Sequence, residues 1–196
     1  MLKEIGGKME YLLGVYGDSI AFGYGNDKSW FDCLDNFSPK IKMAQNGEII
    51  NNVLLKILAD TNTYQTLIIA VGINNFLSDS PVNDNPEVAK KIVEYEEVLK
   101  VAKTRAKHIV VQSVLPVIEN KFPNQKYLDD PRWIFNVNAV EFNKMLKPLA
   151  QKYGAQYVDA FSVFNSKNLE DLYFDGVHPN ATGQNLLLEI YENELK

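Results

Sequence analysis

The sequence predicts a three-layer α/β/α domain built around a five-stranded parallel sheet. Short apolar runs alternate with longer amphipathic stretches along the chain, which is typical of the α/β class. Three of the runs are nearly continuous in β-branched and large aliphatic residues, as in parallel strands that are buried on both faces. At 196 residues, 46% of them hydrophobic, the chain can bury a substantial core. We expect a single domain over residues 9–196, preceded by an N-terminal extension at 1–8.

Five apolar runs are the expected strands. In chain order they are "YLLGVYG" at 11–17, "IKMAQ" at 41–45, "TLIIAVG" at 66–72, "HIVVQSVLP" at 108–116 and "AQYVDAF" at 155–161. Between them, apolar residues recur at three- and four-residue spacing, which predicts helices that each bury one face. Right-handed crossovers place such helices on both faces of a parallel sheet. The helical stripes are Ile50, Val53, Leu54, Ile57 and Leu58; Val88, Ile92, Tyr95, Leu99, Ala102 and Ala106; Val137, Val140, Met145, Leu146 and Leu149; and Leu187, Ile190 and Tyr191.

Composition excludes several classes of protein. The net charge of −5 comes without a long run of one sign, so nothing indicates a nucleic-acid partner. Cys33 is the only cysteine, which excludes an internal disulfide and a multi-cysteine metal site, and we interpret it as a small buried apolar residue. The apolar run near the N-terminus is too short for a signal peptide or a membrane span, so we expect a cytoplasmic protein without integral membrane association. The sequence does not indicate an oligomeric state.

Residues that can take part in catalysis or ligand binding follow four of the five predicted strands. Ligands of open α/β sheets bind beyond the carboxyl ends of the strands. A serine follows the first run, a glycine the second and an asparagine the third, and an aspartate and a histidine lie beyond the fifth. These residues are Ser19, Gly47, Asn74, Asp175 and His178.

Only two histidines can serve an imidazole-based reaction. His178 lies in a Gly/Pro/Asn-rich turn, three residues after Asp175, whose carboxylate can accept from the imidazole and fix its tautomer. We interpret His108, at a junction of helix and strand, as structural. A serine such as Ser19 needs a base of this kind to become a nucleophile. Each feature also has a structural alternative, because Asp18 or Ser19 can cap a helix and an Asp–His pair can cap the helix after it.

Four blocks of the sequence together resemble the SGNH hydrolases, the GDSL-type esterases and lipases. Ser19 in "YGDSIAFGYG" matches the first block, and Gly47 is the only glycine available for the second. Asn74 in "VGINN" matches the third block and "DGVHPNATG" the last. The resemblance implies a flavodoxin-like SGNH hydrolase fold.

The resemblance also implies roles for the matching residues. Ser19, His178 and Asp175 would form a catalytic triad. The oxyanion hole would comprise the backbone N–H groups of Ser19 and Gly47 and the side-chain amide of Asn74. No metal or organic cofactor is implied, and the partner is a small-molecule acyl ester. The chain departs from the family pattern at Asn75, where an aspartate is usual.

Two long segments at this edge of the sheet, 77–87 and 117–133, are expected to set specificity. Aromatic residues in the second region can form an apolar wall or a stacking platform, or can pack on the core. Because no long hydrophobic insertion is present, we expect short acyl groups, such as acetyl on a carbohydrate or small alcohol. Lysophospholipase, acyl-thioesterase and O-acyltransferase activity on the same triad, or a catalytically idle binding domain, are the alternatives. The aromatic residues are Phe122, Tyr127, Trp133 and Phe135.

Overall fold

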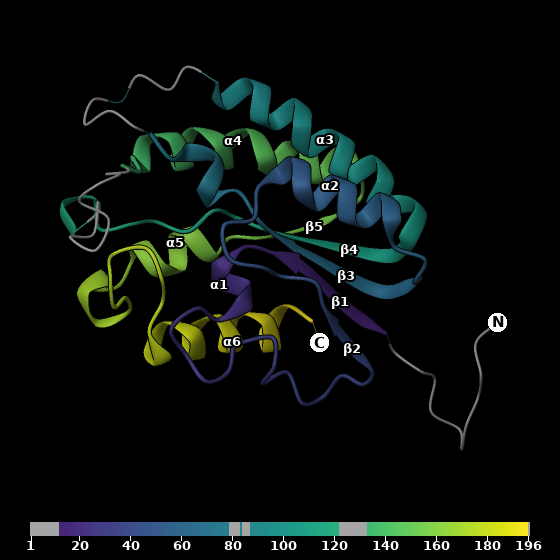
Figure 1. Cartoon of the computed structure of the whole chain (residues 1–196), viewed down its shortest axis with the longest axis horizontal. Helices are drawn as coiled ribbons and strands as arrows, with labels where there is room; N and C mark the ends of the chain where they lie inside the picture. The colour runs from purple at the N-terminus through teal and green to yellow at the C-terminus, as the bar shows by residue number, and fades with distance from the viewer. Residues whose placement is uncertain (1–11, 79–82, 84–86, 122–132, 196) are drawn as a thin grey trace.

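A five-stranded parallel sheet is the centre of the fold, as predicted (Figure 1). The computed structural model describes residues 12–78, 83, 87–121 and 133–195, and the sheet is described within these. Its strands are β1 (Leu13–Gly17), β2 (Lys40–Lys42), β3 (Tyr64–Ala70), β4 (Ala106–Gln112) and β5 (Gln156–Val158). All neighbouring strands pair in parallel, in the order β2-β1-β3-β4-β5.

Helices cover both faces of the sheet and complete the predicted three layers. The α-helices are α1 (Ser19–Phe22), α2 (Ile50–Ala59), α3 (Val88–Arg105), α4 (Asn136–Lys152), α5 (Ala160–Asn165) and α6 (Ala181–Glu194). Short 3-10 turns are η1 (Ile73–Phe76), η2 (Glu119–Lys121) and η4 (Leu169–Asp171). Figure 1 shows α2, α3 and α4 on one face of the sheet, and α1, α5 and α6 on the other.

Four predicted strands end earlier than expected. β2 ends at Lys42 rather than at 45, and β3 ends at Ala70 rather than at 72. β5 ends at Val158 rather than at 161, because the Asp159 side chain accepts the N–H of Ser162 and begins α5. β4 ends at Gln112 rather than at 116. Beyond it, the side-chain amide of Asn143 pairs with the N–H and the carbonyl of Val114, at 2.9 Å each, where a neighbouring strand would otherwise pair.

The predicted helical stripes mostly face the core, with three exceptions. Ile50, Val53 and Ile57 of α2 are fully buried, and the same holds for the central apolar residues of α3, α4 and α6. Leu58 and Val137, however, are 51% and 56% exposed. Ala106 is not helical, because it is the first residue of β4.

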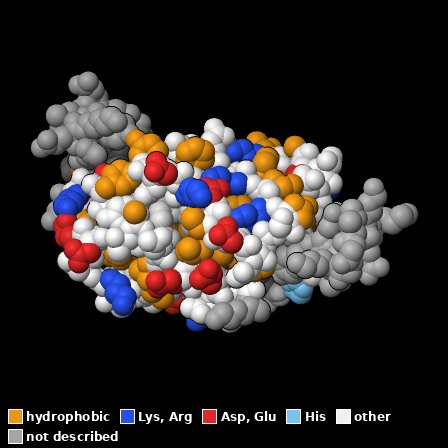
Figure 2. All heavy atoms as spheres, turned by 90° about the horizontal axis from the view of Figure 1, so that it is seen from below, with side chains coloured by type: hydrophobic (Ala, Val, Ile, Leu, Met, Phe, Trp, Pro, Cys, Tyr) orange, Lys and Arg blue, Asp and Glu red, His pale blue; other side chains and the backbone are white. Residues whose placement is uncertain are grey.

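The remaining expectations concern the N-terminal extension, membrane association and the distribution of charge on the surface. The expected extension at 1–8 lies outside the described residues. None of the helices in the described ranges has the length and apolar character needed to cross a bilayer. On the face seen in Figure 2, acidic and basic side chains are interspersed.

Candidate active site

The turn after β1 combines close packing with a helix cap. A Cβ at Gly17 would lie 2.5 Å from the Cβ of Ala21 and 2.8 Å from the carbonyl of Ala70, so only glycine fits there. Asp18 caps α1, because its Oδ1 accepts the N–H of Ile20 at 3.0 Å. Ser19 is the first helical residue and is 4% exposed. The capping interpretation therefore applies to Asp18 and leaves the Ser19 hydroxyl available.

Ser19, His178 and Asp175 form one chain of hydrogen bonds. The Nε2 of His178 lies 2.9 Å from the Oγ of Ser19, and its Nδ1 lies 2.6 Å from the Oδ2 of Asp175. Because an ionised carboxylate only accepts, this contact places the ring proton on Nδ1 and leaves Nε2 as an acceptor toward the serine. In such a chain of hydrogen bonds, an imidazole can take the proton of a serine hydroxyl while a carboxylate orients the imidazole.

Asp175 is held by its own turn. Its Oδ1 accepts the backbone N–H groups of Val177 and His178, at 3.0 and 2.7 Å. Burial alone would raise the pKa of this carboxyl, but the hydrogen bonds from the His178 ring and from these backbone groups keep the pKa below its ordinary value. Asp175 is therefore ionised at neutral pH and can stabilise a positive charge on the imidazole.

Gly47 and Asn74 come together from the ends of β2 and β3. The Nδ2 of Asn74 donates to the carbonyl of Glu48 at 2.9 Å, next to Gly47. An asparagine amide has two N–H groups, so one remains for a ligand. Gly47 has a φ of +73°, in the left-handed region, and a Cβ built on it meets nothing within 4 Å. The Ser19 N–H has no acceptor within its own helix, because it belongs to the first turn.

Asn75 keeps a structural role despite its departure from the family pattern. Its Oδ1 accepts the N–H of Ile50 at 3.1 Å, at the start of α2. An aspartate at this position has the same acceptor, so the substitution removes a charge and retains the hydrogen bond. The contact ties the Asn74 turn to the segment that carries Gly47.

Asp18 also joins the serine turn to the Asn74 turn, a connection that sequence reasoning missed. Asp18 is 3% exposed, and burial raises its pKa from 3.8 to about 6. Hydrogen bonds from the backbone N–H groups of Ile20, Gly72 and Ile73 favour the ionised form but do not cancel this effect. A buried carboxylate thus links the helix that carries Ser19 to the residues before Asn74.

The raised pKa of Asp18 predicts a pH dependence of stability. A folded-state pKa above the unfolded one contributes stability that is complete below about pH 4 and is lost as the pH rises through about 6. Between pH 7 and pH 5, we expect this carboxyl to add on the order of 1 kcal/mol to the free energy of unfolding. Denaturant unfolding at both pH values measures the gain. In Asp18→Asn this part of the gain should vanish, and an identical gain in both proteins would contradict the assignment.

Two aromatic rings, also missed in the sequence, flank His178. The ring centroids of Tyr24 and Phe174 lie 4.6 and 5.8 Å from that of the imidazole. Phe174 is 46% exposed. Their position in the sequence could have indicated this contact, because Phe174 directly precedes Asp175 and Tyr24 follows the serine turn.

The long segments are described only in part. Ser78 and Trp133 exchange two backbone hydrogen bonds of 2.8 Å, so the start of the first segment meets the end of the second. Trp133 and Phe135 are half-buried, and Phe122 and Tyr127 lie outside the described residues.

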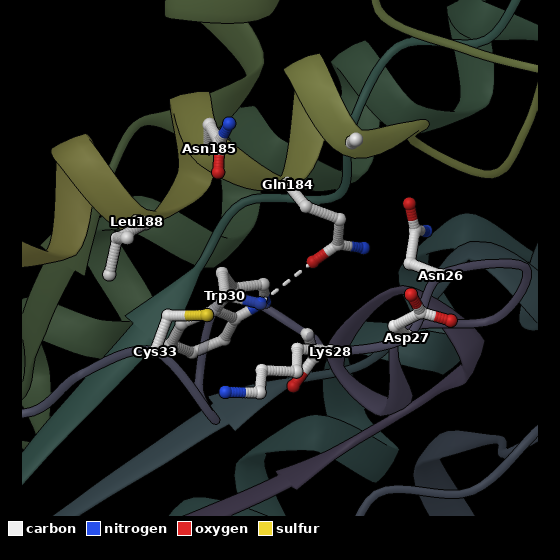
Figure 3. Close-up of a pocket in the computed structure, with 10 residues that line it drawn as sticks. Asn26, Asp27, Lys28, Trp30, Cys33, Gln184, Asn185 and Leu188 are labelled. Atoms are coloured by element: carbon white, nitrogen blue, oxygen red, sulfur yellow. Dashed lines mark hydrogen bonds between the residues drawn. The ribbon is translucent and has the colours of Figure 1, made fainter.

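The remaining candidate residues lie away from these groups. His108 is exposed and lies toward the amino end of β4. Cys33 is half-buried rather than buried, and lines a cavity of about 200 Å³ between segment 26–33 and α6 (Figure 3). None of the proposed triad residues lines this cavity. Among the described residues, no group of three or more His, Cys, Asp or Glu side chains is arranged to hold a metal ion.

Comparison with known proteins identifies related sequences and folds. The model of the GDSL-like Lipase/Acylhydrolase family matches residues 15–186. No curated protein sequence gives a significant match. A member of the lipolytic protein G-D-S-L family from Veillonella parvula DSM 2008 has a TM-score of 0.72 at 15% identity, over 93% of this chain and 97% of its own.

Two further solved structures share the fold. The acetyl xylan esterase AlAXEase has a TM-score of 0.72 at 16% identity, over 94% of this chain and 100% of its own. The lipase/acylhydrolase from Enterococcus faecalis has a TM-score of 0.69 at 16% identity, over 94% of this chain and 95% of its own. At these identities the likeness shows the fold alone.

Proposed function

Because the chain belongs to the GDSL-like lipase/acylhydrolase family, we propose that it is a serine esterase that cleaves carboxylic esters through an acyl-serine intermediate. The observation that carries the proposal is the unbroken chain of hydrogen bonds from the Ser19 hydroxyl through His178 to Asp175. Family membership supports ester hydrolysis in general. The roles of individual residues are part of the proposal.

The reaction follows from the geometry in two steps. Ser19 Oγ attacks the ester carbonyl while His178 Nε2 takes the hydroxyl proton, which forms a tetrahedral oxyanion. His178 then returns that proton to the leaving alcohol as the C–O bond breaks, which leaves an acyl-serine. Water, deprotonated by the same nitrogen, attacks the acyl carbon and releases the carboxylic acid and the Ser19 hydroxyl. Asp175 holds the imidazole in the required tautomer throughout.

The developing oxyanion requires donors at its position. We assign this role to the N–H groups of Ser19 and Gly47 and to the free N–H of the Asn74 amide. These groups are fixed before the substrate arrives, because Asn74 is held by Glu48 and Asn75 by Ile50. Preorganised donors of this kind stabilise the transition state more than the ground state.

The assignment of Asn74 predicts a selective loss of turnover. In Asn74→Ala, we expect kcat to fall on the order of 10²–10³-fold with little change in KM, because one oxyanion donor is removed. Steady-state kinetics on a soluble ester measures both constants. Asn52→Ala, an exposed asparagine of α2, serves as the control and should behave as wild type. An unchanged kcat in Asn74→Ala would remove this residue from the oxyanion hole.

For the substrate, we propose a short acyl group, such as acetyl, on a carbohydrate or small alcohol. The absence of a long hydrophobic insertion in the sequence supports a short acyl chain. The leaving alcohol must approach His178 Nε2 to receive its proton, so the neighbouring Tyr24 and Phe174 rings are suited to contact a sugar face. The name of one structural neighbour, an acetyl xylan esterase, is in line with this.

A series of p-nitrophenyl esters from acetate to palmitate tests the proposal. We expect cleavage that is fastest for acetate and falls steeply with chain length. Faster cleavage of long chains would favour a lysophospholipase or acyl-thioesterase. Transfer of the acyl group to an added alcohol, measured as new ester, would identify an acyltransferase.

A further inference from the structure

The proposed nucleophile and base come from distant parts of the chain, and their alignment depends on contacts between two segments. Ser19 begins α1, and His178 lies just before α6, 159 residues later. Gln184, in the second turn of α6, is 4% exposed and lies between these segments. Its buried amide is therefore placed to connect the two segments.

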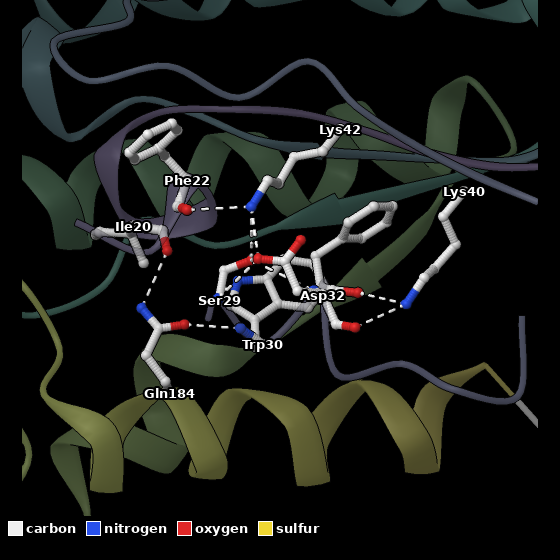
Figure 4. A network of polar contacts seen from close by, with 9 residues as sticks. Ile20, Phe22, Ser29, Trp30, Asp32, Lys40, Lys42 and Gln184 are labelled. Carbon is white, nitrogen blue, oxygen red and sulfur yellow. Dashed lines mark hydrogen bonds and ion pairs between the residues drawn. The ribbon is translucent and has the colours of Figure 1, made fainter. Parts of the chain in front are cut away.

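Both ends of the Gln184 amide are bonded to the serine segment (Figure 4). Its Oε1 accepts the backbone N–H of Trp30 at 2.9 Å, and its Nε2 donates to the carbonyl of Ile20 at 3.1 Å. Ile20 directly follows the serine. One partner is a donor and the other an acceptor, and the oxygen and nitrogen of the amide satisfy both, so the orientation of the amide is fixed.

A second amide makes an equivalent link beside the histidine. The Nδ2 of Asn26 donates to the carbonyl of Tyr24 at 3.1 Å and to the carbonyl of Pro179 at 2.9 Å. Pro179 directly follows His178. Figure 3 shows Asn26 and Gln184 on the wall of the same cavity. The two amides therefore connect the residues next to the nucleophile with those next to the base.

Other contacts hold the same segments together without either amide. The Nζ of Lys40 donates to the carbonyls of Phe31, Asp32 and Leu34, at 2.9–3.1 Å, and so anchors this segment to β2. The indole ring of Trp30 stacks on Tyr191 of α6, with centroids 3.9 Å apart. Loss of the Gln184 amide should thus shift α1 relative to α6 rather than unfold the chain.

We propose that Gln184, assisted by Asn26, is a positioning residue that sets the distance and angle between Ser19 Oγ and His178 Nε2. The inference rests on the proposed function, since the alignment matters only if the serine attacks an ester. The two amides would affect the rate of the chemical step through this alignment, and not the binding of the substrate. Neither amide is proposed to contact the substrate.

Three variants test this role. Gln184→Met keeps the length of the side chain and removes both hydrogen bonds. Asn26→Asp puts a carboxylate opposite the carbonyls of Tyr24 and Pro179, at a more exposed site. Tyr191→Phe is the matched control, because it removes a buried hydrogen bond of α6, from the Tyr191 hydroxyl to Gln112 at 2.9 Å, and keeps the ring that stacks on Trp30.

Each variant is measured by ester hydrolysis, by thermal unfolding and by the rate at which a fluorophosphonate labels Ser19. For Gln184→Met we expect kcat and the labelling rate to fall about 10- to 100-fold, because small misplacements of reacting groups are costly. We expect KM to stay within about two-fold. Asn26→Asp should show the same pattern. Tyr191→Phe should lose thermal stability but keep both rates.

The outcomes separate this inference from the proposed function. Equal losses of kcat in Gln184→Met and Tyr191→Phe, in proportion to stability, would overturn the inference alone, as would wild-type labelling of Gln184→Met. Wild-type protein that neither cleaves esters nor reacts with the probe would overturn the proposed function, and the inference with it. If Gln184→Met does not fold, Asn26→Asp decides: reduced labelling supports the positioning role, and unchanged labelling contradicts it.

Discussion

Replacing Ser19 with alanine is expected to abolish ester cleavage, with a fall in kcat on the order of 10⁶-fold, the size of loss that follows removal of the nucleophile from a serine protease. The substitution removes the only atom that can form the acyl intermediate in the proposed reaction. The fold should persist, because alanine suits the first turn of α1 and the cap from Asp18 to Ile20 is unaffected. Hydrolysis of p-nitrophenyl acetate and the thermal midpoint are the two measurements.

A second serine controls for the loss of a hydroxyl. Ser162 in α5 is exposed and its hydroxyl donates to Asp159 at 2.9 Å, away from the proposed site. Ser162→Ala should cleave the ester at the wild-type rate. Undiminished turnover in folded Ser19→Ala would show that another group performs the chemistry and would remove the triad assignment.

Replacing Asp175 with asparagine is expected to lower kcat by about 10⁴-fold. The amide can still accept the N–H groups of Val177 and His178, so the turn should persist. Its NH₂ group, however, would face Nδ1 as a donor, which favours the tautomer with the proton on Nε2. That nitrogen then cannot accept the proton of Ser19.

Asp171→Asn is the matched control for this change. Asp171 is an exposed aspartate four residues upstream, whose carboxylate accepts from the side chain of Asn168 at 3.1 Å. Steady-state kinetics should show wild-type activity for Asp171→Asn. If Asp175→Asn retained more than about a tenth of wild-type kcat, a role in fixing the tautomer would be excluded.

The fold class and the position of the five candidate site residues at one end of the sheet could be predicted from sequence for different reasons. Continuous apolar runs predict buried parallel strands, and the parallel direction of the strands brings their carboxyl ends to one edge of the sheet. Short motifs identify the residues at that edge because a turn such as Gly17-Asp18-Ser19 depends on local geometry: the glycine is required by its contact with Ala70. Asp175 and His178 are likewise close in sequence, so their pairing is local.

The ends of elements and the supporting contacts could not be predicted. β4 stops where Asn143 of α4 takes over its hydrogen bonds, and no periodicity in either segment indicates that meeting. The same holds for Gln184, which reads as one more polar residue of a helix although it bonds Ile20 and Trp30. Such contacts depend on how distant segments of the chain pack against each other. The spacing of apolar residues predicts which face of a helix or strand is buried, but it does not predict which polar groups form hydrogen bonds.

Identification of the residue that reacts covalently is the most direct test of Ser19 as the nucleophile. The wild-type protein would be incubated with a fluorophosphonate, and the modified peptide identified by mass spectrometry. We predict a single adduct on the Ser19 hydroxyl, absent in Ser19→Ala and formed far more slowly in Asp175→Asn. An adduct on another residue, or none in folded wild-type protein, would contradict the assignment of Ser19 as the nucleophile activated by His178.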